Sequence, residues 1–177
     1  WLSAVAVIAL YGAAVTTKEH TITLVAFLLL TDYFWNPGFT FEGIRRNWRL
    51  YVPLAAAAAA GAALVYQLVR GAVTAGFNVE GLPWYDYLYT QFRALWVYLR
   101  LFVFPVGQNA DYDYPISRGL FDRSAILGLA GLVLLVGSAW YFRKRYPLAA
   151  FGVLGALLLF LPTSSVVPIQ DAVAERR

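Results

Sequence analysis

The sequence predicts an all-α, polytopic membrane protein, because its composition is strongly apolar, its apolar residues form long segments and its basic residues cluster between them. Of 177 residues, 60% are hydrophobic and only 14% are charged. The mean hydropathy is +0.61. Soluble domains carry roughly 25% charged residues. The chain therefore lacks the polar residues that would cover a soluble core, and a lipid bilayer is the solvent that its apolar surface requires.

Five apolar segments are candidates to span the bilayer, for which a helix needs about 20 residues, within a range of roughly 17–25. The candidate spans are residues 1–17, 21–35, 50–70, 120–142 and 147–163. The first begins inside an apolar run, has no Met and lacks the basic n-region of a signal peptide. We therefore expect residues 1–177 to be a piece of one membrane domain that belongs to a longer protein.

Small residues in the third and fourth spans predict close helix packing. The segment from Ala55 to Ala63 contains only Ala and Gly61, and the fourth span contains Gly128, Gly131 and Gly137. In membranes, small side chains let helix backbones approach one another closely. These two spans are therefore expected to make the tightest helix contacts.

Basic residues in two connections predict the orientation of the spans, because Lys and Arg concentrate in cytoplasmic loops. One cluster lies between the second and third spans, and the other lies between the fourth and fifth. The two clusters are Arg45, Arg46 and Arg49, and Arg143, Lys144 and Arg145. Both connections are expected on the cytoplasmic side of a bacterial inner membrane. Residues 71–119 then form a long outer loop, and the hairpin at residues 18–20 is also outside.

Residues 84–104 of the outer loop are expected to form an aromatic-rich helix that lies in the outer interface. Trp and Tyr favour the headgroup region of a bilayer, and this segment is rich in both. If the segment crossed the membrane, the second basic cluster would fall outside. Arg93 and Arg100 are seven positions apart and therefore share one face of this helix.

Charged residues from three separate parts of the chain reach the outer face in this topology. They are the hairpin residues Lys18, Glu19 and His20, then Arg93, and finally the tail residues Glu175 and Arg176. Charge close to apolar depth marks a functional site by default. An ordinary interpretation stays open for each of them, since a hairpin can simply be solvated and arginines can extend to lipid phosphates. Asp32, near the inner end of the second span, is interpreted as a buried structural partner.

Several motifs resemble those of the tetratricopeptide-repeat membrane O-mannosyltransferases and their bacterial relatives. The segments 16–24 and 30–33 (TTKEHTITL and LTDY) resemble the family's pattern of "SKE", then T and L, then "YD". Residues 160–165 and 173–177 resemble its "LP-S-N" and "AER-YLP" elements, and residues 89–93 are similar to the segment between. The likeness keeps the order of the elements along nearly the whole chain. His20 stands where the family often has Gln, and Ser164-Ser165 stand near an expected Asn, so the choice of sugar and acceptor stays open.

The resemblance implies the C-terminal part of a glycosyltransferase of the C-type membrane fold. Such enzymes transfer a mannose-like sugar from a polyprenyl-phosphate carrier to an acceptor hydroxyl on the extracytoplasmic side. The expected partners are therefore a polyprenyl-phosphate-linked sugar, an acceptor protein or glycan, and the lipid bilayer. In this family tetratricopeptide repeats usually follow the membrane part. No cofactor is expected, the need for a divalent metal stays open, and the scattered basic residues argue against nucleic acid as a partner.

The resemblance and the expected topology together suggest a donor phosphate site. Arg93 and Arg176, with Lys18 as a third cation, are expected to bind the donor phosphate, because Arg binds phosphate oxygens in pairs and cations stabilise the leaving group. Three further residues are expected to support these cations: Glu19, His20 and Glu175. The catalytic base, a carboxylate of the first outer loop in such folds, is expected upstream of this chain. The fragment by itself would then be inactive.

Two other functions stay open at this stage. The chain could be a non-catalytic membrane anchor of a tetratricopeptide-repeat interaction protein, which composition does not exclude. It could also be a transporter, but a transporter needs polar residues near the midplane of its spans. The five spans are almost purely apolar between their ends, which favours the enzyme over the transporter. An acidic pair in the first outer loop of the complete protein would favour the enzyme over the anchor.

Overall fold

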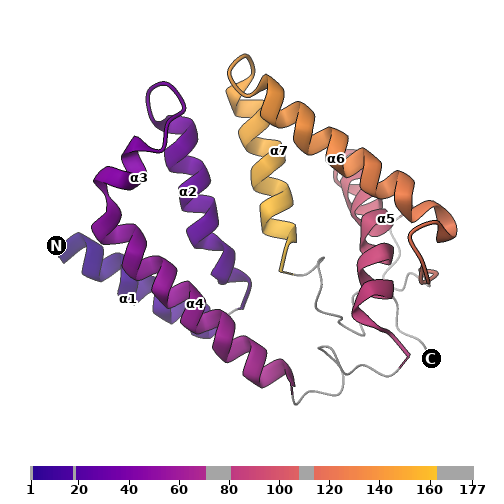
Figure 1. Ribbon diagram of the computed structural model, residues 1–177, viewed down its shortest axis with the longest axis horizontal. Helices are drawn as coiled ribbons and strands as arrows, with labels where there is room; N and C mark the ends of the chain where they lie inside the picture. Colours follow the sequence, from indigo (N-terminus) through magenta and orange to yellow (C-terminus); the bar gives the residue numbers. More distant parts are fainter. Residues whose placement is uncertain (1, 18, 71–80, 108–113, 163–177) are drawn as a thin grey trace. The chain divides into compact units, whose positions relative to one another are not determined.

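The computed structural model describes residues 2–17, 19–70, 81–107 and 114–162, and all regular secondary structure within these ranges is helical. The helices in chain order are α1 (Leu2–Thr17), η1 (Glu19–Thr23), α2 (Leu24–Trp35), α3 (Glu42–Arg46), α4 (Trp48–Arg70), α5 (Trp84–Val103), η2 (Asp122–Ser124), α6 (Ala125–Phe142) and α7 (Pro147–Phe160) (Figure 1). The all-α class predicted from the sequence is thus confirmed for these residues.

Two helices are long and apolar enough to cross a membrane. They are the segments Trp48–Gln67, of 20 residues, and Asp122–Phe142, of 21 residues. Three shorter apolar helices cover Val5–Val15, Thr21–Trp35 and Pro147–Phe160. These five segments overlap the five candidate spans, and their bounds differ by two to four residues at several ends. The fourth was expected from residue 120, but residues 120–121 form a turn, and α7 ends at Phe160 because residues 161–162 are also a turn.

Helix α6 leaves most of its apolar surface exposed in the described part of the chain. Only Ala125 and Gly128 of its residues are buried, whereas Leu127 and Leu134 expose 68% and 70% of their surfaces. A helix that is apolar on every side belongs in a protein core or in a membrane. The apolar surface that the described residues leave exposed on α6 agrees with the length and composition that would allow this helix to cross a membrane.

The chain divides into two compact units, residues 1–68 with 138–162 and residues 69–137 with 163–177. In the first unit α1, α2 and α4 share an apolar cluster centred on Tyr11, Val25 and Leu54. The predicted close packing of the alanine-rich span is observed at Gly61, where an added Cβ would lie 3.0 Å from Val15 Cγ1. The small residues of α4 therefore let its backbone approach α1.

Helix α2 also packs against α7 in the first unit. An added Cβ at Gly155 would lie 3.0 Å from the Phe27 ring, and Tyr33, Phe34 and Ala150 form the buried centre of this contact. The end of α2 thus meets the start of α7, so the two helices run in opposite directions. This is the arrangement expected of the second and fifth spans.

Asp32 is a structural partner at the inner end of α2. Its carboxylate lies near the Tyr51 hydroxyl, and its buried Oδ2 has no hydrogen-bond partner among the described residues. An added Cβ at Gly43 would lie 2.7 Å from Asp32 Oδ2, so α3 approaches the carboxylate closely. Asp32 therefore fixes the turn from α2 through α3 into α4, and this arrangement agrees with its structural interpretation.

In the second unit α5 packs tightly against α6. Trp96 donates from Nε1 to the Gly128 carbonyl oxygen over 2.9 Å, and an added Cβ at Gly131 would lie 2.6 Å from the Trp96 ring. An added Cβ at Gly128 would lie 2.8 Å from the Phe92 carbonyl carbon. The prediction of close packing was wrong for Gly137, which has nothing within 4 Å in the described residues because α5 does not extend along that part of α6.

Candidate functional site

Arg93, on α5, is held by the loop that precedes α6. Its Nη1 donates to the Pro115 carbonyl oxygen over 3.1 Å and to the Ser117 hydroxyl over 2.9 Å. The guanidinium carbon lies 4.8 Å from the centre of the Tyr114 ring, which is a cation–π contact. Three residues of one loop, Tyr114, Pro115 and Ser117, therefore fix the position of this cation.

The sequence of α5 places a polar face toward this loop. Asp86, Thr90 and Arg93 occupy positions i, i+4 and i+7, which lie on one side of a helix. The Thr90 hydroxyl donates to the Asp86 carbonyl oxygen over 2.7 Å and accepts from the Ser117 backbone N–H over 2.9 Å. The loop backbone is thus fastened to α5 one turn before Arg93.

Much of the Arg93 guanidinium is not engaged by these contacts. A guanidinium has five N–H donors, and both hydrogen bonds leave from a single nitrogen, Nη1. No carboxylate of the residues in the described ranges forms an ion pair with Arg93. The side chain is half-buried. Among the described residues, the arrangement therefore offers an oriented positive charge without a carboxylate partner, which a phosphate could bind through paired hydrogen bonds.

Two further polar side chains of α5 are buried with unsatisfied atoms. Gln91 is 1% exposed, and neither its amide oxygen nor its amide nitrogen has a partner among the described residues. Asp86 is 9% exposed, and the same holds for its Oδ1. Buried polar groups cost free energy unless they are hydrogen-bonded. This side of α5 therefore has donors and acceptors that the described chain does not use.

Tyrosines around Arg93 are held in their protonated form. Burial, with a smaller contribution from Tyr98, raises the pKa of Tyr87 to about 12. Burial also raises the pKa values of Tyr98 and Tyr114, and at Tyr114 the nearby Arg93 partly opposes this rise. The three phenols are therefore neutral near pH 7, so Arg93 has no phenolate counter-charge there.

The other predicted site residues are not brought together with Arg93 by the described structure. Lys18, Glu175 and Arg176 lie outside the described residues. Glu19 and His20 begin η1, directly after α1, but their side chains also lie outside the description. The proposed cluster of cations thus stays a prediction, and Arg93 is the member with a defined environment.

The sequence interpretation missed the residues that hold Arg93. The sequence analysis gave no part in the site to the four residues that hold Arg93 or its loop: Thr90, Tyr114, Pro115 and Ser117. The spacing of Asp86, Thr90 and Arg93 was an available signal, since it marks a polar stripe on an otherwise apolar and aromatic helix. Nothing in the sequence indicated which loop would cover that stripe.

In the part of the chain that the structure describes, no three His, Asp or Glu side chains gather in a group suited to a metal ion. Comparisons with models of protein families, with curated proteins and with solved structures find no match for this chain.

Proposed function

We propose that this chain is part of a membrane glycosyltransferase that transfers a sugar, mannose-like by resemblance, from a polyprenyl-phosphate carrier to an acceptor hydroxyl. The acceptor is a protein or glycan at the extracytoplasmic face of a bacterial inner membrane. The observation that carries the proposal is the guanidinium of Arg93, which is fixed on an aromatic-rich helix and has no carboxylate partner among the described residues. The motif likeness supplies the reaction class.

The position of α5 at the membrane surface is supported by a parity argument within the chain. Arg143 Nε donates to the Tyr33 hydroxyl over 2.8 Å, so the end of α2 and the end of α6 lie together. The chain between these two points must then cross the membrane an even number of times. Helices α4 and α6 supply two crossings, which leaves α5 on one side of the bilayer.

A helix at the surface places Arg93 at the depth of lipid phosphates. A polyprenyl-phosphate sugar keeps its tail among the acyl chains and its phosphate at the interface. Trp84, Tyr85 and Trp96 of α5 are exposed, as expected for side chains that lie among headgroups. The donor phosphate would therefore meet Arg93 without leaving the interface.

The reaction breaks the bond between the sugar anomeric carbon and the phosphate oxygen, and it forms a bond from the acceptor oxygen to that carbon. Negative charge grows on the leaving phosphate, and a preorganised cation there lowers the barrier. Arg93 has this role in the proposal, and Lys18 and Arg176 add charge to the same phosphate. A carboxylate takes the acceptor proton, and we place that base upstream of residue 1.

The proposal is tested with the complete protein and a radiolabelled polyprenyl-phosphate mannose donor. Arg93→Lys keeps the charge but loses the planar fork, and we expect transfer to fall by about 10²-fold or more, the scale on which oriented charge contributes. Arg176→Ala is expected to abolish transfer without loss of folding. The matched control is Arg100→Lys, since Arg100 is exposed on the same helix and is given no part in binding.

Equal transfer by the wild type, Arg93→Lys and Arg176→Ala would overturn the phosphate role of these residues. A complete protein that transfers no sugar from any polyprenyl-phosphate donor would favour the membrane-anchor alternative. Folding of each variant is checked by size-exclusion chromatography and circular dichroism, so that loss of structure is not mistaken for loss of chemistry.

A further inference from the structure

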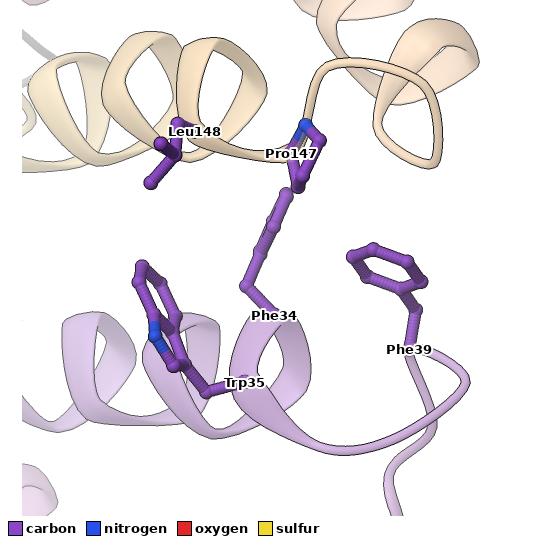
Figure 2. A pocket seen from close by; sticks show the side chains of 5 residues that line it. All are labelled: Phe34, Trp35, Phe39, Pro147 and Leu148. Carbon is purple, nitrogen blue, oxygen red and sulfur yellow. The ribbon is translucent and has the colours of Figure 1, made fainter.

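An apolar pocket of 190 Å³ lies in the first unit, between the end of α2 and the start of α7. Its walls are formed by Phe34, Trp35, Phe39, Pro147 and Leu148 (Figure 2). In Figure 2 the Phe34 ring points toward Pro147, with Trp35 opposite Leu148 on one side and Phe39 on the other. Trp35 is 59% exposed and Leu148 is 74% exposed, so the pocket is accessible from outside the helices.

The size and lining of the pocket suit a hydrocarbon chain. None of the five lining side chains carries a charge, and all five are apolar or aromatic. An apolar cavity of about 150 Å³ in another protein stays free of water and accepts a benzene molecule. This pocket is larger, so it can hold several methylene groups.

Basic residues lie close in the sequence to both segments that line the pocket. Residues 143–145 directly precede the lining residues of α7, and Lys144 and Arg145 are exposed. Arg45, Arg46 and Arg49 follow Phe39 and are also exposed. The acidic residues in these two connections are Asp32, which is half-buried, and Glu42. With six basic and two acidic residues, this end of the first unit carries a net positive charge.

The side chain of Arg143 is held by contacts within the first unit. Its Nε donates to the Tyr33 hydroxyl, and its Nη1 donates to the Trp140 carbonyl oxygen over 2.6 Å. Its guanidinium carbon also lies 4.2 Å from the centre of the Trp140 ring. The exposed positive charge nearest in sequence to Pro147 therefore comes from Lys144 and from Arg145, whose guanidinium carbon lies 5.4 Å from the centre of the Tyr146 ring.

We infer that this pocket binds one acyl chain of an anionic phospholipid, whose phosphate lies against Lys144 and Arg145. The exposed aromatic side chains at this end, Trp35, Trp48 and Tyr146, place it at the depth of the headgroups. A basic site next to an apolar pocket at that depth complements both parts of an anionic lipid. A neutral lipid would fill the pocket but gain nothing from the two cations. This inference does not depend on the proposed enzymatic function.

The test is native mass spectrometry of the complete protein in detergent, with added dioleoyl-phosphatidylglycerol or dioleoyl-phosphatidylcholine. We expect one phosphatidylglycerol molecule to bind about tenfold more tightly than phosphatidylcholine, because two cations face its phosphate. Raising the salt concentration should reduce this preference. Lys144→Glu should remove most of the preference while leaving residual binding of both lipids. Leu148→Trp, which fills the pocket, should weaken the binding of both lipids.

Matched controls separate the pocket from general contact with lipid. Leu134→Trp makes the same change at an exposed position of α6, and Arg118→Glu makes a charge reversal of equal size in the loop before α6. Both controls should bind phosphatidylglycerol as the wild type does. Equal affinity of the wild-type protein for the two lipids would overturn the inference, and so would unchanged binding by a folded Leu148→Trp variant.

Discussion

Arg143 and Tyr33, 110 positions apart in the chain, are joined by a hydrogen bond of 2.8 Å from Arg143 Nε to the tyrosine hydroxyl. The Trp140 ring stacks on Tyr33 with 5.5 Å between the ring centres and an angle of 15° between the planes. Arg143 in turn lies over the Trp140 ring. This three-residue contact fastens the end of α2 to the end of α6 and the basic connection that follows it.

Removal of the Tyr33 hydroxyl should loosen this contact. Tyr33→Phe keeps the aromatic stack but leaves Arg143 Nε without its partner, and hydrogen bonds to charged groups contribute about 1.5–3 kcal/mol. We expect the free energy of unfolding in detergent to fall by about that amount. Tyr141→Phe is the control, because Tyr141 is 77% exposed. A loss of stability of equal size in both variants would contradict the role of the Tyr33 hydroxyl.

The topology can be tested by site-directed labelling, because the chain contains no cysteine. We expect Arg46→Cys and Lys144→Cys to react with an impermeant maleimide only after the cells are permeabilised. Arg118→Cys and Glu19→Cys should react in intact cells, since their positions precede α6 and α2 on the other side. Opposite labelling of Arg46→Cys and Lys144→Cys would show that α5 crosses the bilayer, and the Arg93 site would then not lie at the outer interface.

Gly128 should tolerate no side chain at the contact between α5 and α6. A Cβ there would lie 2.8 Å from the Phe92 carbonyl carbon, which belongs to the backbone and cannot move without the helix. Gly128→Ala should therefore separate the helices, break the Trp96 hydrogen bond and destabilise the protein by about 1–3 kcal/mol. Gly137→Ala, on the same helix with nothing within 4 Å, should have no such effect. Thermal unfolding of both variants in the same detergent measures this difference in stability.

Tyr87 should make stability sensitive to alkaline pH. Its pKa in the folded protein is about 12, above the ordinary value of 10, so the folded state favours the protonated phenol. Its contribution to stability is complete below pH 10 and is lost as the pH rises to about 12. In an absorbance titration of the 12 tyrosines, Tyr87→Phe should remove a late step. An unchanged titration curve would mean that Tyr87 is accessible to solvent.

The helices of this chain could be predicted from the sequence nearly residue by residue. Trp84–Val103 was expected as a helix over residues 84–104, and α4 agrees with the third span within two residues at its start. The candidate site was predicted less well. Arg93 was identified, but its contacts with Tyr114 and Ser117 were not, because they join residues more than 20 positions apart. Gly128, Gly131 and Gly137 show the same limit, since three equivalent glycines of one helix differ only in what lies opposite.

By itself, the sequence determined the all-helical class and the main apolar helices, because apolar composition and helix periodicity are properties of each segment alone. Only the tertiary structure decided which loop holds Arg93, which glycine admits a neighbouring helix, and that Tyr33 and Arg143 meet. These contacts depend on the distance and direction between segments far apart in the chain. Such geometry is fixed when the helices pack, and no local pattern of residues encodes it.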